Sequence, residues 1–502
     1  MERLLKLAKM EIQFGTDGWR AKIADTYTFE NVRKVAQATA TFWKSEKRKK
    51  LECYTWKPGT YACTYRPPER GLVVGYDARF LSEDFALEVA KVLAANGIPV
   101  FLSKTITPTP VTSFAITERN LSGGVMITAS HNPYRWNGFK IKMEFGGSSL
   151  PAITDGVEEE LKKMTRENIS PLTTPKAPIE EIDLISPFFD AIRKKVDLAS
   201  IEKQAYKIMV DPLYGTNVGL FKRFLPKANV HELHGYRDPL FGGLNPEPID
   251  LNLRELMASV PKEGAAVGLA VDGDGDRIGA VDENGNFLSS HEIFCLLLWH
   301  LVKHRKWSGG VAKTFSTTNR VKLLAEHFKL PFYETPIGFK HIAKLFLTED
   351  ILIGGEESGG IGIKNHIPER DSLLNALLLL ELMSVTGKKL GEILQEIHQT
   401  IGTFYTDRLD MELLPTHRQR VLTCLQQNIP GEIGGLKVEG SSTLDGVKYL
   451  LEGHAWMLFR PSGTEPLIRI YAEARNRDDV KKMLDRGRTI VEEESHAGAT
   501  KG

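Results

Sequence analysis

Gly123-Gly124-Val125-Met126-Ile127-Thr128-Ala129-Ser130-His131-Asn132-Pro133 is the stretch of this 502-residue chain from which its fold can be worked out. Its apolar run, 125–127, is typical of a buried strand. Turn-forming residues follow, and Pro133 disfavours helical backbone at Asn132. An α/β protein places a nucleophile at the end of such a strand, although serine also caps helices. The stretch alone therefore leaves two interpretations of Ser130, a nucleophile and a helix cap.

Apolar runs and helical patterns alternate on both sides of this stretch. Expected strands lie at 72–77, 98–102, 206–211, 267–271 and 311–315, and expected helices at 29–43, 82–96, 293–304, 320–328 and 373–385. Such alternation predicts an α/β fold with mixed, mostly parallel sheets covered by helices. Beyond residue 401, strand-like runs at 405–409, 456–460 and 467–474 precede a helix at 477–493. This last part is therefore expected to be α+β.

The composition is that of a soluble globular protein, with 42% hydrophobic and 26% charged residues. A net charge of +1 provides no overall field that would attract nucleic acid. The four cysteines have no metal-binding spacing, which suits a reducing compartment. The N-terminus lacks a signal-peptide core, and the most apolar runs are shorter than the ~20 residues that span a bilayer. We expect a cytoplasmic protein with neither membrane nor nucleic-acid partners.

The length of the chain predicts about three or four domains. The segment 151–187 mixes charged residues with proline and threonine and is interpreted as a linker. Expected domains are 1–160, 185–290, 291–398 and 402–496. The segment 44–70 is basic and aromatic. A solvated surface insertion is favoured there over a nucleic-acid stacking surface, and we assign it no function.

Asp272-Gly273-Asp274-Gly275-Asp276-Arg277 places three carboxylates at alternate positions. They can turn toward one hard cation, and oxygen ligands fit Mg²⁺ or Ca²⁺ rather than zinc. A calcium loop of the EF-hand type is disfavoured, because its sixth position is Arg277 rather than glycine and apolar strands flank it. The segment is predicted to be a Mg²⁺ site.

Two further segments join a glycine-rich turn to polar side chains. Gly354–Gly360 presents Glu356 and Ser358, which can bind sugar hydroxyls, although a flexible surface turn has the same composition. In Arg460–Pro466 an arginine fork, two hydroxyls and backbone N–H groups can form an anion cradle; the alternative is a hairpin with one exposed arginine. A serine, a metal loop, a hydroxyl-binding loop and a phosphate cradle together indicate phosphoryl transfer.

These four motifs, in this order along nearly the whole chain, resemble those of the α-D-phosphohexomutase family of phosphoglucomutases, phosphomannomutases and phosphoglucosamine mutases. The resemblance implies three related α/β domains and a smaller C-terminal α+β domain around a central cleft. The segments that carry it are Thr128–Pro133, Asp272–Arg277, Gly355–Gly360 and Arg460–Pro466.

By this resemblance Ser130 carries a phosphoryl group in the resting enzyme. Its phosphate and the carboxylates of Asp272, Asp274 and Asp276 hold Mg²⁺. The phosphoserine donates its phosphoryl group to a sugar phosphate, and the resulting bisphosphate turns over and returns the other phosphate to Ser130. Glucose 1,6-bisphosphate is accordingly expected as intermediate and activator.

The resemblance also assigns catalytic cations and a proton carrier. Lys140, Arg20 and Arg277 match active-site cations, which can stabilise developing negative charge. His131 lies next to the phosphoserine and is a candidate for proton transfer. Substrate-binding residues implied by the family are Glu356, Ser358, Gly338, Lys340, Arg370, Arg460, Ser462, Gly463 and Thr464.

Three positions bear on the choice of sugar and on the acid or base. Gly360 stands where dual-specificity phosphomannomutase/phosphoglucomutase enzymes usually have histidine, and Glu357 where phosphoglucosamine mutases tend to have glutamine. This loop, together with Thr335–Lys340, is more similar to glucose-directed members, most of all bacterial-type phosphoglucomutases. Arg370 stands where phosphoglucomutases often carry lysine, and arginine is a poor proton carrier. Any acid/base role of that lysine must shift here, to His131 or Lys140.

The expected activity is the interconversion of glucose 1-phosphate and glucose 6-phosphate by a monomeric or dimeric enzyme. Mannose phosphate and then glucosamine phosphate are the next candidate substrates. A catalytically silent paralogue is disfavoured, because such proteins usually lose the serine or a metal-loop aspartate. A metal-dependent phosphatase is disfavoured, because hydrolysis needs no second phosphate cradle.

Overall fold

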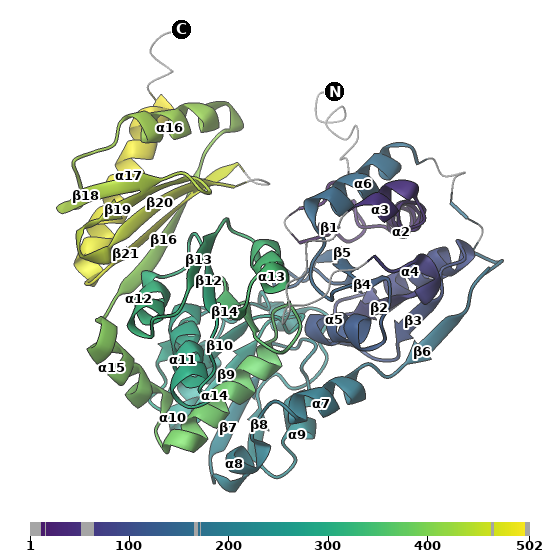
Figure 1. Ribbon diagram of the computed structural model, residues 1–502, viewed down its shortest axis with the longest axis horizontal. Coiled ribbons are helices and arrows are strands. Elements are labelled where there is room, and N and C mark those ends of the chain that lie inside the picture. The colour runs from purple at the N-terminus through teal and green to yellow at the C-terminus, as the bar shows by residue number, and fades with distance from the viewer. Residues whose placement is uncertain are drawn as a thin grey trace.

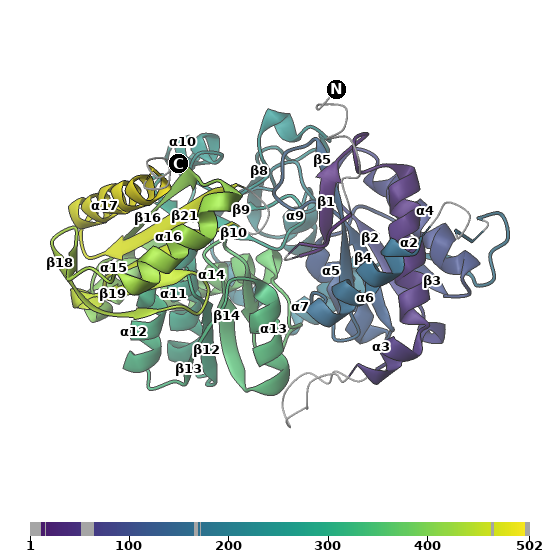
Figure 2. The same ribbon diagram turned by 90° about the horizontal axis from the view of Figure 1, so that it is seen from above.

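The computed structural model describes residues 12–15, 17–51, 65–164, 169–170, 172–462 and 466–496. Along these residues four β-sheets follow one another, each with its own helices (Figure 1). The first and fourth units lie at opposite ends of the molecule in both views (Figures 1 and 2). The predicted fold class, three α/β units followed by an α+β unit, is confirmed.

The first unit contains a six-stranded sheet, in which β4, β2, β3 and β6 are parallel and β5 is antiparallel to both of its neighbours, β4 and β1. Val73 points to the cluster around α5, whereas its neighbours Leu72 and Val74 point to the cluster around α2 and α4, as the two-residue period of a strand requires. The strands in sheet order are β1 (Trp19–Lys22), β5 (Trp136–Met143), β4 (Gly123–Ile127), β2 (Leu72–Tyr76), β3 (Val100–Ser103) and β6 (Ile179–Ile182). The helices are α2 (Phe29–Trp43), α3 (Glu46–Lys50), α4 (Ser82–Ala95), α5 (Thr109–Glu118) and α6 (Pro151–Lys162).

The second and third units repeat this plan with smaller sheets, of five and four strands. The second consists of β11 (Phe287–Leu288), β10 (Ile278–Val281), β9 (Val267–Val271), β7 (Lys207–Asp211) and β8 (Asn229–Glu232), with α7 (Ile185–Arg193), α8 (Leu198–Lys203), α9 (Leu220–Phe224) and α10 (Arg254–Lys262). The third consists of β13 (Phe332–Thr335), β12 (Gly310–Thr314), β14 (Ile351–Gly355) and β15 (Ile361–Ile363), with α11 (Ser290–Lys303), α12 (Asn319–His327), α13 (Phe339–Thr348), α14 (Ser372–Thr386) and α15 (Leu390–Ile401).

One connection has the same form in all three units. A buried strand that is parallel to its neighbour on one side continues through a short loop into an antiparallel strand on the other side: β4 into β5, β9 into β10, and β14 into β15. These loops carry Ser130, the three aspartates of the metal loop, and Glu356 respectively. Three of the four motifs found in the sequence therefore occupy equivalent places in repeated units.

The fourth unit is an antiparallel sheet covered by two helices. Its strands in sheet order are β16 (Tyr405–Glu412), β21 (Leu467–Ala474), β20 (Trp456–Pro461), β19 (Val447–Leu451), β18 (Leu436–Ser442) and β17 (Glu432–Ile433), and its helices are α16 (Pro415–Gln427) and α17 (Arg477–His496). It has its own hydrophobic core. It meets the third unit through a small apolar cluster of Phe315, Trp456, Leu458 and Tyr471.

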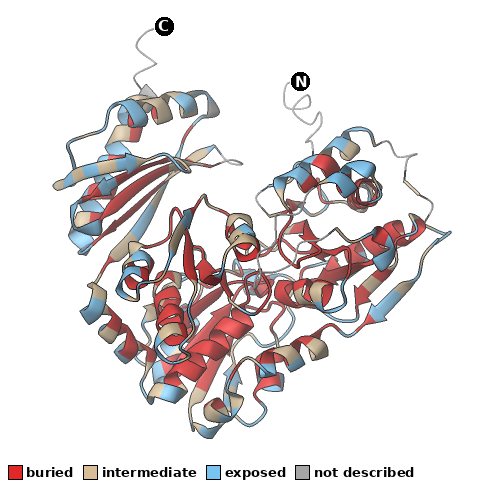
Figure 3. Ribbon diagram, in the orientation of Figure 1, coloured by how far each residue is buried: buried red, intermediate tan, exposed pale blue. Residues whose placement is uncertain are grey.

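A single large core joins the first three units. It includes Val111 of α5, Phe188 of α7, Val267 of β9 and Leu378 of α14. Helix α14 is buried from Ser372 to Met383 and runs through the red interior of Figure 3. A helix that is apolar on all sides is stable in water only when other elements surround it. The units that carry the three loops are therefore packed against one another rather than loosely linked.

One of the sequence-based predictions for this part of the chain was wrong. The segment 151–187, predicted to be a linker, contributes α6 and the edge strand β6, so the first sheet extends to Ile182. In the segment 44–70, predicted to be a solvated insertion, most of the described residues are exposed, but Arg48 is buried and pairs with Glu144 at 2.6 Å. Residues 52–64 of that segment lie outside the described residues. Across the described chain, the helices are too short or too polar to traverse a lipid bilayer.

We expect Gly156→Ala to destabilise the first unit, although alanine favours helices. A Cβ at Gly156 of α6 would overlap the buried ring of Phe42 on α2, and overpacking of this kind costs about 1–3 kcal/mol. Calorimetry should show a lower thermal midpoint. At Gly391 of α15 the nearest atom lies 3.4 Å from the added Cβ, so Gly391→Ala should be neutral or stabilising by up to about 1 kcal/mol. Equal effects of the two changes would contradict the packing described for α6.

Candidate functional site

Ser130 lies in the loop between β4 and β5, within contact distance of the metal loop. Its Oγ donates a hydrogen bond to Asp272 Oδ2 at 2.9 Å, and its backbone N–H donates to Thr128 Oγ1 at 2.9 Å. Its backbone φ of 52° is left-handed, a conformation that costs a non-glycine residue about 1–2 kcal/mol. The loop leads directly into β5. Ser130 therefore caps no helix, and its buried hydroxyl faces the metal loop.

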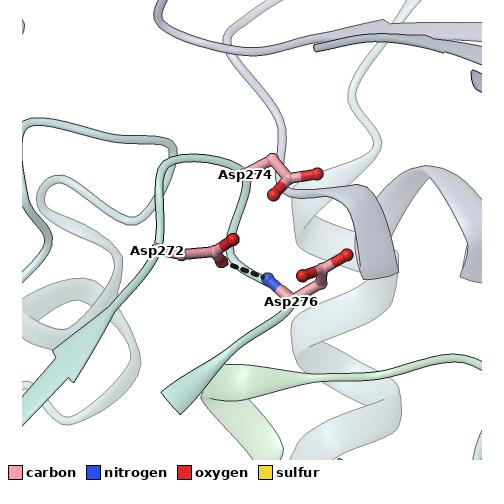
Figure 4. A group of neighbouring side chains, drawn as sticks. All are labelled: Asp272, Asp274 and Asp276. Atoms are coloured by element: carbon pink, nitrogen blue, oxygen red, sulfur yellow. Dashed lines mark hydrogen bonds between the residues drawn. The ribbon is translucent and has the colours of Figure 1, made fainter. Parts of the chain in front are cut away.

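The loop between β9 and β10 brings three carboxylates together (Figure 4). One ligand atom from each of Asp272, Asp274 and Asp276 lies within 4.8 Å of the others, and all three residues are buried. Asp272 Oδ1 accepts from the backbone N–H groups of Asp276 and Arg277 at 2.9 and 3.0 Å, which closes the turn. The flanking elements are strands, so the geometry is not that of an EF-hand.

The charges of this loop suit a bound divalent cation. Burial, followed by the charges of Asp274 and Asp276, raises the pKa of Asp272 well above its usual range, and burial likewise raises the pKa of Asp276. Asp274 Oδ1 and Asp276 Oδ1 have no hydrogen-bond partner among the described residues. Buried carboxylate oxygens without partners are the donor set that Mg²⁺ and Ca²⁺ prefer. The residues present therefore fit such an ion.

Lys140 of β5 is a buried cation between two loops. Its Nζ lies 2.8 Å from Asp17 Oδ2, 2.8 Å from Asp274 Oδ2 and 3.6 Å from Asp276 Oδ2. Burial lowers the pKa of Lys140, but the three carboxylates outweigh burial and raise it overall. Lys140 pulls the pKa of Asp274 below its usual range although burial opposes this. Lys140 thus stays charged at neutral pH and is poorly suited to donate a proton.

His131 lies beside Ser130 in a polar cluster that includes Glu247. Its Nδ1 lies 3.1 Å from Glu247 Oε1, and Arg277 Nη1 donates to the same oxygen at 3.2 Å. Burial and the charge of Arg277 lower the pKa of His131 to about 4. The imidazole is therefore neutral at pH 7 and can accept a proton. Arg20 of β1 also points into this region, donating to Asn132 Oδ1 at 2.6 Å.

The loop between β14 and β15 lies against the metal loop. The backbone N–H of Ile278 donates to the carbonyl of Gly359 at 3.1 Å. Glu356 is buried, with Arg370 Nη1 3.7 Å from its Oε2. Burial raises the pKa of Glu356 to about 7, even though Arg370 acts in the opposite direction. Ser358, two residues further along, is half-buried.

Arg370 connects this loop to the rest of the site. Its Nη2 lies 2.7 Å from Asp276 Oδ2 and 3.1 Å from Asp17 Oδ2. A Cβ at Gly360 would overlap Arg370 Cδ. Gly360 and Arg370 are two departures from common family patterns. In its present position Arg370 requires the absence of a side chain at position 360.

Two more predicted substrate residues lie at the start of α13. Gly338 is the residue before the helix, and the ring centroid of Phe339 lies 5.4 Å from the Arg370 guanidinium carbon. Lys340, in the first turn of α13, makes no hydrogen bond or ion pair within the described part of the chain.

The predicted phosphate cradle lies in the fourth unit. Arg460 Nε donates to Asp445 Oδ1 at 3.1 Å, and Asp445 Oδ2 accepts from the backbone N–H of Ile337 at 2.9 Å. The backbone N–H of Ser462 donates to the carbonyl of Leu467 at 2.8 Å. Gly463 and Thr464 lie outside the described residues. Among the described residues, no hydrogen bond or ion pair joins Arg460 directly to the Ser130 network.

Sequence reasoning missed three polar residues of the site. Asp17 pairs with Lys140 and Arg370, and its place in the glycine-rich segment 14–20 was a signal that could have identified it. Glu247 had no sequence signal. Thr109, whose Oγ1 donates to Asp274 Oδ2 at 2.6 Å, was hidden in a Thr-Pro repeat.

Comparison with known proteins gives consistent matches along the chain. Four family models match: phosphoglucomutase/phosphomannomutase alpha/beta/alpha domain I at residues 54–168, domain II at 186–285, domain III at 289–401, and the C-terminal domain at 428–489. A phosphoglucomutase/phosphomannomutase of Thermococcus kodakarensis is 29% identical, covering 96% of this chain and 98% of that protein. A phosphoglucosamine/phosphogalactosamine mutase of Sulfurisphaera tokodaii is 28% identical, covering 95% and 99%.

Solved structures show the same relationship. A Thermus thermophilus protein, provisionally assigned as a phosphomannomutase, superposes with a TM-score of 0.80 at 34% identity, covering 96% of this chain and 99% of that chain. The phosphoglucomutase parafusin of Paramecium shares the fold, with a TM-score of 0.77 at 20% identity and 98% and 96% coverage.

We expect Glu356→Gln to stabilise the protein at high pH. The folded-state pKa of about 7 exceeds the ordinary value of 4.5, so the folded state holds the proton more tightly. Stability then falls as pH rises from about 4.5 to 7, and the full cost, at most about 3 kcal/mol, is present above pH 7. The gain in thermal midpoint should be larger at pH 8 than at pH 5. A gain that is the same at both pH values would contradict the raised pKa.

A divalent cation should stabilise the protein through the metal loop. At a concentration of 100 times the dissociation constant, binding to the folded state alone adds about 2.7 kcal/mol. Asp276→Asn removes one buried ligand and should abolish most of the rise in thermal midpoint that Mg²⁺ produces. Asp250→Asn, at an exposed aspartate of the same unit, is the matched control. An equal Mg²⁺ response in both variants would show that the ion binds elsewhere.

Proposed function

Because the chain belongs to the phosphoglucomutase/phosphomannomutase family, we propose that it interconverts glucose 1-phosphate and glucose 6-phosphate through a phosphoserine at Ser130. The observation that carries this proposal is the hydrogen bond from Ser130 Oγ to Asp272, at the edge of three buried carboxylates. A serine hydroxyl beside a divalent-cation site is the arrangement that a phosphoryl-transfer enzyme needs.

Mg²⁺ is the ion we assign to the aspartate loop. Asp272, Asp274 and Asp276 would hold it together with the Ser130 phosphate, and when bound it neutralises charge on the transferring phosphoryl group. The unpartnered oxygens of Asp274 and Asp276 support this assignment.

The chain's own residues account for the transfer itself. A hydroxyl of the bound sugar phosphate attacks the phosphorus of the Ser130 phosphate, and the bond from phosphorus to Ser130 Oγ breaks. His131, neutral at pH 7, takes the proton that the sugar hydroxyl loses. Lys140 stays protonated and stabilises the charge that develops on Oγ. His131 then passes this proton to Ser130 Oγ, so the products are glucose 1,6-bisphosphate and a serine hydroxyl.

The second half of the reaction reverses these roles after the bisphosphate reorients. Ser130 Oγ attacks the phosphorus of the other phosphate and gives its proton to His131. The bond from that phosphorus to the sugar oxygen breaks, and His131 returns the proton to the sugar oxygen. The phosphate that does not react is held by Arg460 and Ser462, whose place at the end of β20 supports an anion cradle. One phosphate is held in the cradle while the other is transferred at Ser130, and exchange of the two phosphates between these sites allows both transfers with one serine.

The sugar is held by the loop between β14 and β15. Glu356 accepts hydrogen bonds from sugar hydroxyls and Ser358 adds a donor and acceptor. Gly360 leaves room for Arg370 rather than for a side chain of its own. Because similar proteins include phosphoglucosamine/phosphogalactosamine and phosphoglucomutase/phosphomannomutase enzymes, glucosamine and mannose phosphates are the competing substrates.

The test compares turnover of glucose, mannose and glucosamine 1-phosphates with Mg²⁺ and a trace of glucose 1,6-bisphosphate. We expect glucose 1-phosphate to have the highest kcat/KM, and Ser130→Ala to lower kcat by several orders of magnitude. Intact mass after incubation with the bisphosphate should show one added phosphoryl group in the wild type and none in Ser130→Ala.

Ser113→Ala is the matched control, because Ser113 of α5 is buried and its Oγ has no hydrogen-bond partner among the described residues. It should retain wild-type turnover. Preference for mannose or glucosamine phosphate would keep the mechanism and overturn the choice of sugar. Undiminished turnover by Ser130→Ala would overturn the phosphoserine mechanism.

A further inference from the structure

Arg79, in the turn after β2, is a fully buried arginine that contacts the backbone of the Ser130 loop. Its Nη2 donates to the carbonyl oxygens of Ser130 at 2.5 Å and Asn132 at 2.7 Å. Its Nη1 donates to the carbonyl oxygens of Pro133 and Trp136, both at 3.0 Å. One guanidinium thus binds four carbonyl groups of a single loop.

The fifth N–H of the guanidinium has a partner as well. Arg79 Nε donates to Asp77 Oδ2 at 3.0 Å, and Ser82 Oγ donates to Asp77 Oδ1 at 2.6 Å. A guanidinium has five N–H donors in a planar fork, and each of these five has an acceptor. Lysine, with one ammonium group on a flexible stem, cannot reproduce that arrangement.

The second unit covers the face of this guanidinium. The ring of Phe241 is buried, and the Arg79 Cζ lies 4.9 Å from its centroid. Phe241 belongs to the segment 237–243, in which Asp238 Oδ2 accepts from the backbone N–H of Gly242 at 2.9 Å. An aromatic face attracts a cation and excludes water, which strengthens the hydrogen bonds beneath it.

The metal loop also approaches the Ser130 carbonyl. A Cβ at Gly273 would lie 2.8 Å from the carbonyl oxygen of Ser130, so that oxygen is close to both Arg79 and the metal loop. The left-handed backbone of Ser130 (φ 52°) is unfavourable by itself and needs surrounding contacts to persist. The distance from Ser130 Oγ to Asp272 therefore depends on where Arg79 holds the loop.

We propose that Arg79 is the positioning residue that fixes Ser130 for phosphoryl transfer, and that Phe241 makes this fixation depend on the docking of the second unit against the first. The expected effects on turnover rest on the proposed function. The expected effect on the order of the Ser130 loop does not. The hydrogen bonds of Arg79 go to Asp77 and to backbone carbonyls of the serine segment, and none goes to a side chain of the metal loop or of the Glu356 loop. Its loss should therefore affect the transfer step and leave substrate binding largely intact.

The experiment compares Arg79→Lys with the wild type. Misplacement of a reacting group by about 1 Å costs on the order of 100-fold in rate, so kcat should fall about 100-fold while KM for the sugar phosphate changes little. Phosphorylation of Ser130 by glucose 1,6-bisphosphate should slow in parallel. Hydrogen exchange of the segment 128–136, followed by mass spectrometry, should become faster while the rest of the first unit keeps its exchange rates.

Arg119→Lys is the matched control, because Arg119 also lies over an aromatic ring, here within the first unit, with its Cζ 5.0 Å from the Phe101 centroid. It should leave kcat and exchange of 128–136 unchanged. Phe241→Leu keeps apolar volume but removes the aromatic face, and should lower kcat in the same direction by a smaller factor. In Arg79→Ala, added guanidinium ion should restore part of the lost rate.

Wild-type kcat and exchange in Arg79→Lys would overturn the proposal, as would a defect confined to KM. If Arg79→Lys does not fold, Phe241→Leu tests the proposal instead. Unchanged kcat and unchanged hydrogen exchange of 128–136 in that variant would overturn the positioning role of Arg79 and Phe241. A wild-type protein without mutase turnover would instead contradict the proposed function, and the exchange measurement on 128–136 would still test the role of Arg79.

Discussion

Two buried cations set among carboxylates hold the site together, and the rest of the structure is arranged around them. Lys140 pairs with Asp17 and Asp274, and Arg370 pairs with Asp17 and Asp276. These contacts join the N-terminal segment and loops of all three α/β units. Removing one partner from a buried pair costs about 3–5 kcal/mol, because the remaining charge stays desolvated. The same ion pairs therefore determine both the relative placement of the three units and the charge balance of the site.

The repeated architecture explains why such a network can form. In each α/β unit the same strand–loop–strand connection carries one polar group: Ser130, the three-aspartate loop or Glu356. The shared core around α14 packs the units so that these connections face one another. The fourth unit has a separate core and meets the third through a small apolar cluster and the Asp445 contact. The loops of the first three units are thus fixed by packing in a shared core. The position of the phosphate cradle depends instead on the smaller interface between the fourth unit and the third.

Much of this organisation could be predicted from the sequence, and what was missed has a physical reason. Strand β9 is a short apolar run, β21 is rich in apolar residues, and the three aspartates alternate with glycines, so local pattern alone identified them. Strand β6 reads Ile-Glu-Glu-Ile, and an edge strand with exposed charges looks like a linker. The burial of Arg48 and Arg79 depends on partners distant in the chain, Glu144 and the Ser130 loop, which no local pattern reveals.

The features that make the site chemically useful also oppose folding. The left-handed backbone of Ser130, the unpartnered oxygens of Asp274 and Asp276, and the buried carboxylate of Glu356 are each unfavourable by themselves. The proposed function gives each a ligand of complementary chemistry: a phosphoryl group, a divalent cation and sugar hydroxyls. The large apolar core offsets their cost, and binding recovers part of it. Occupation of the site and stability of the chain should consequently rise together, because the same groups determine both.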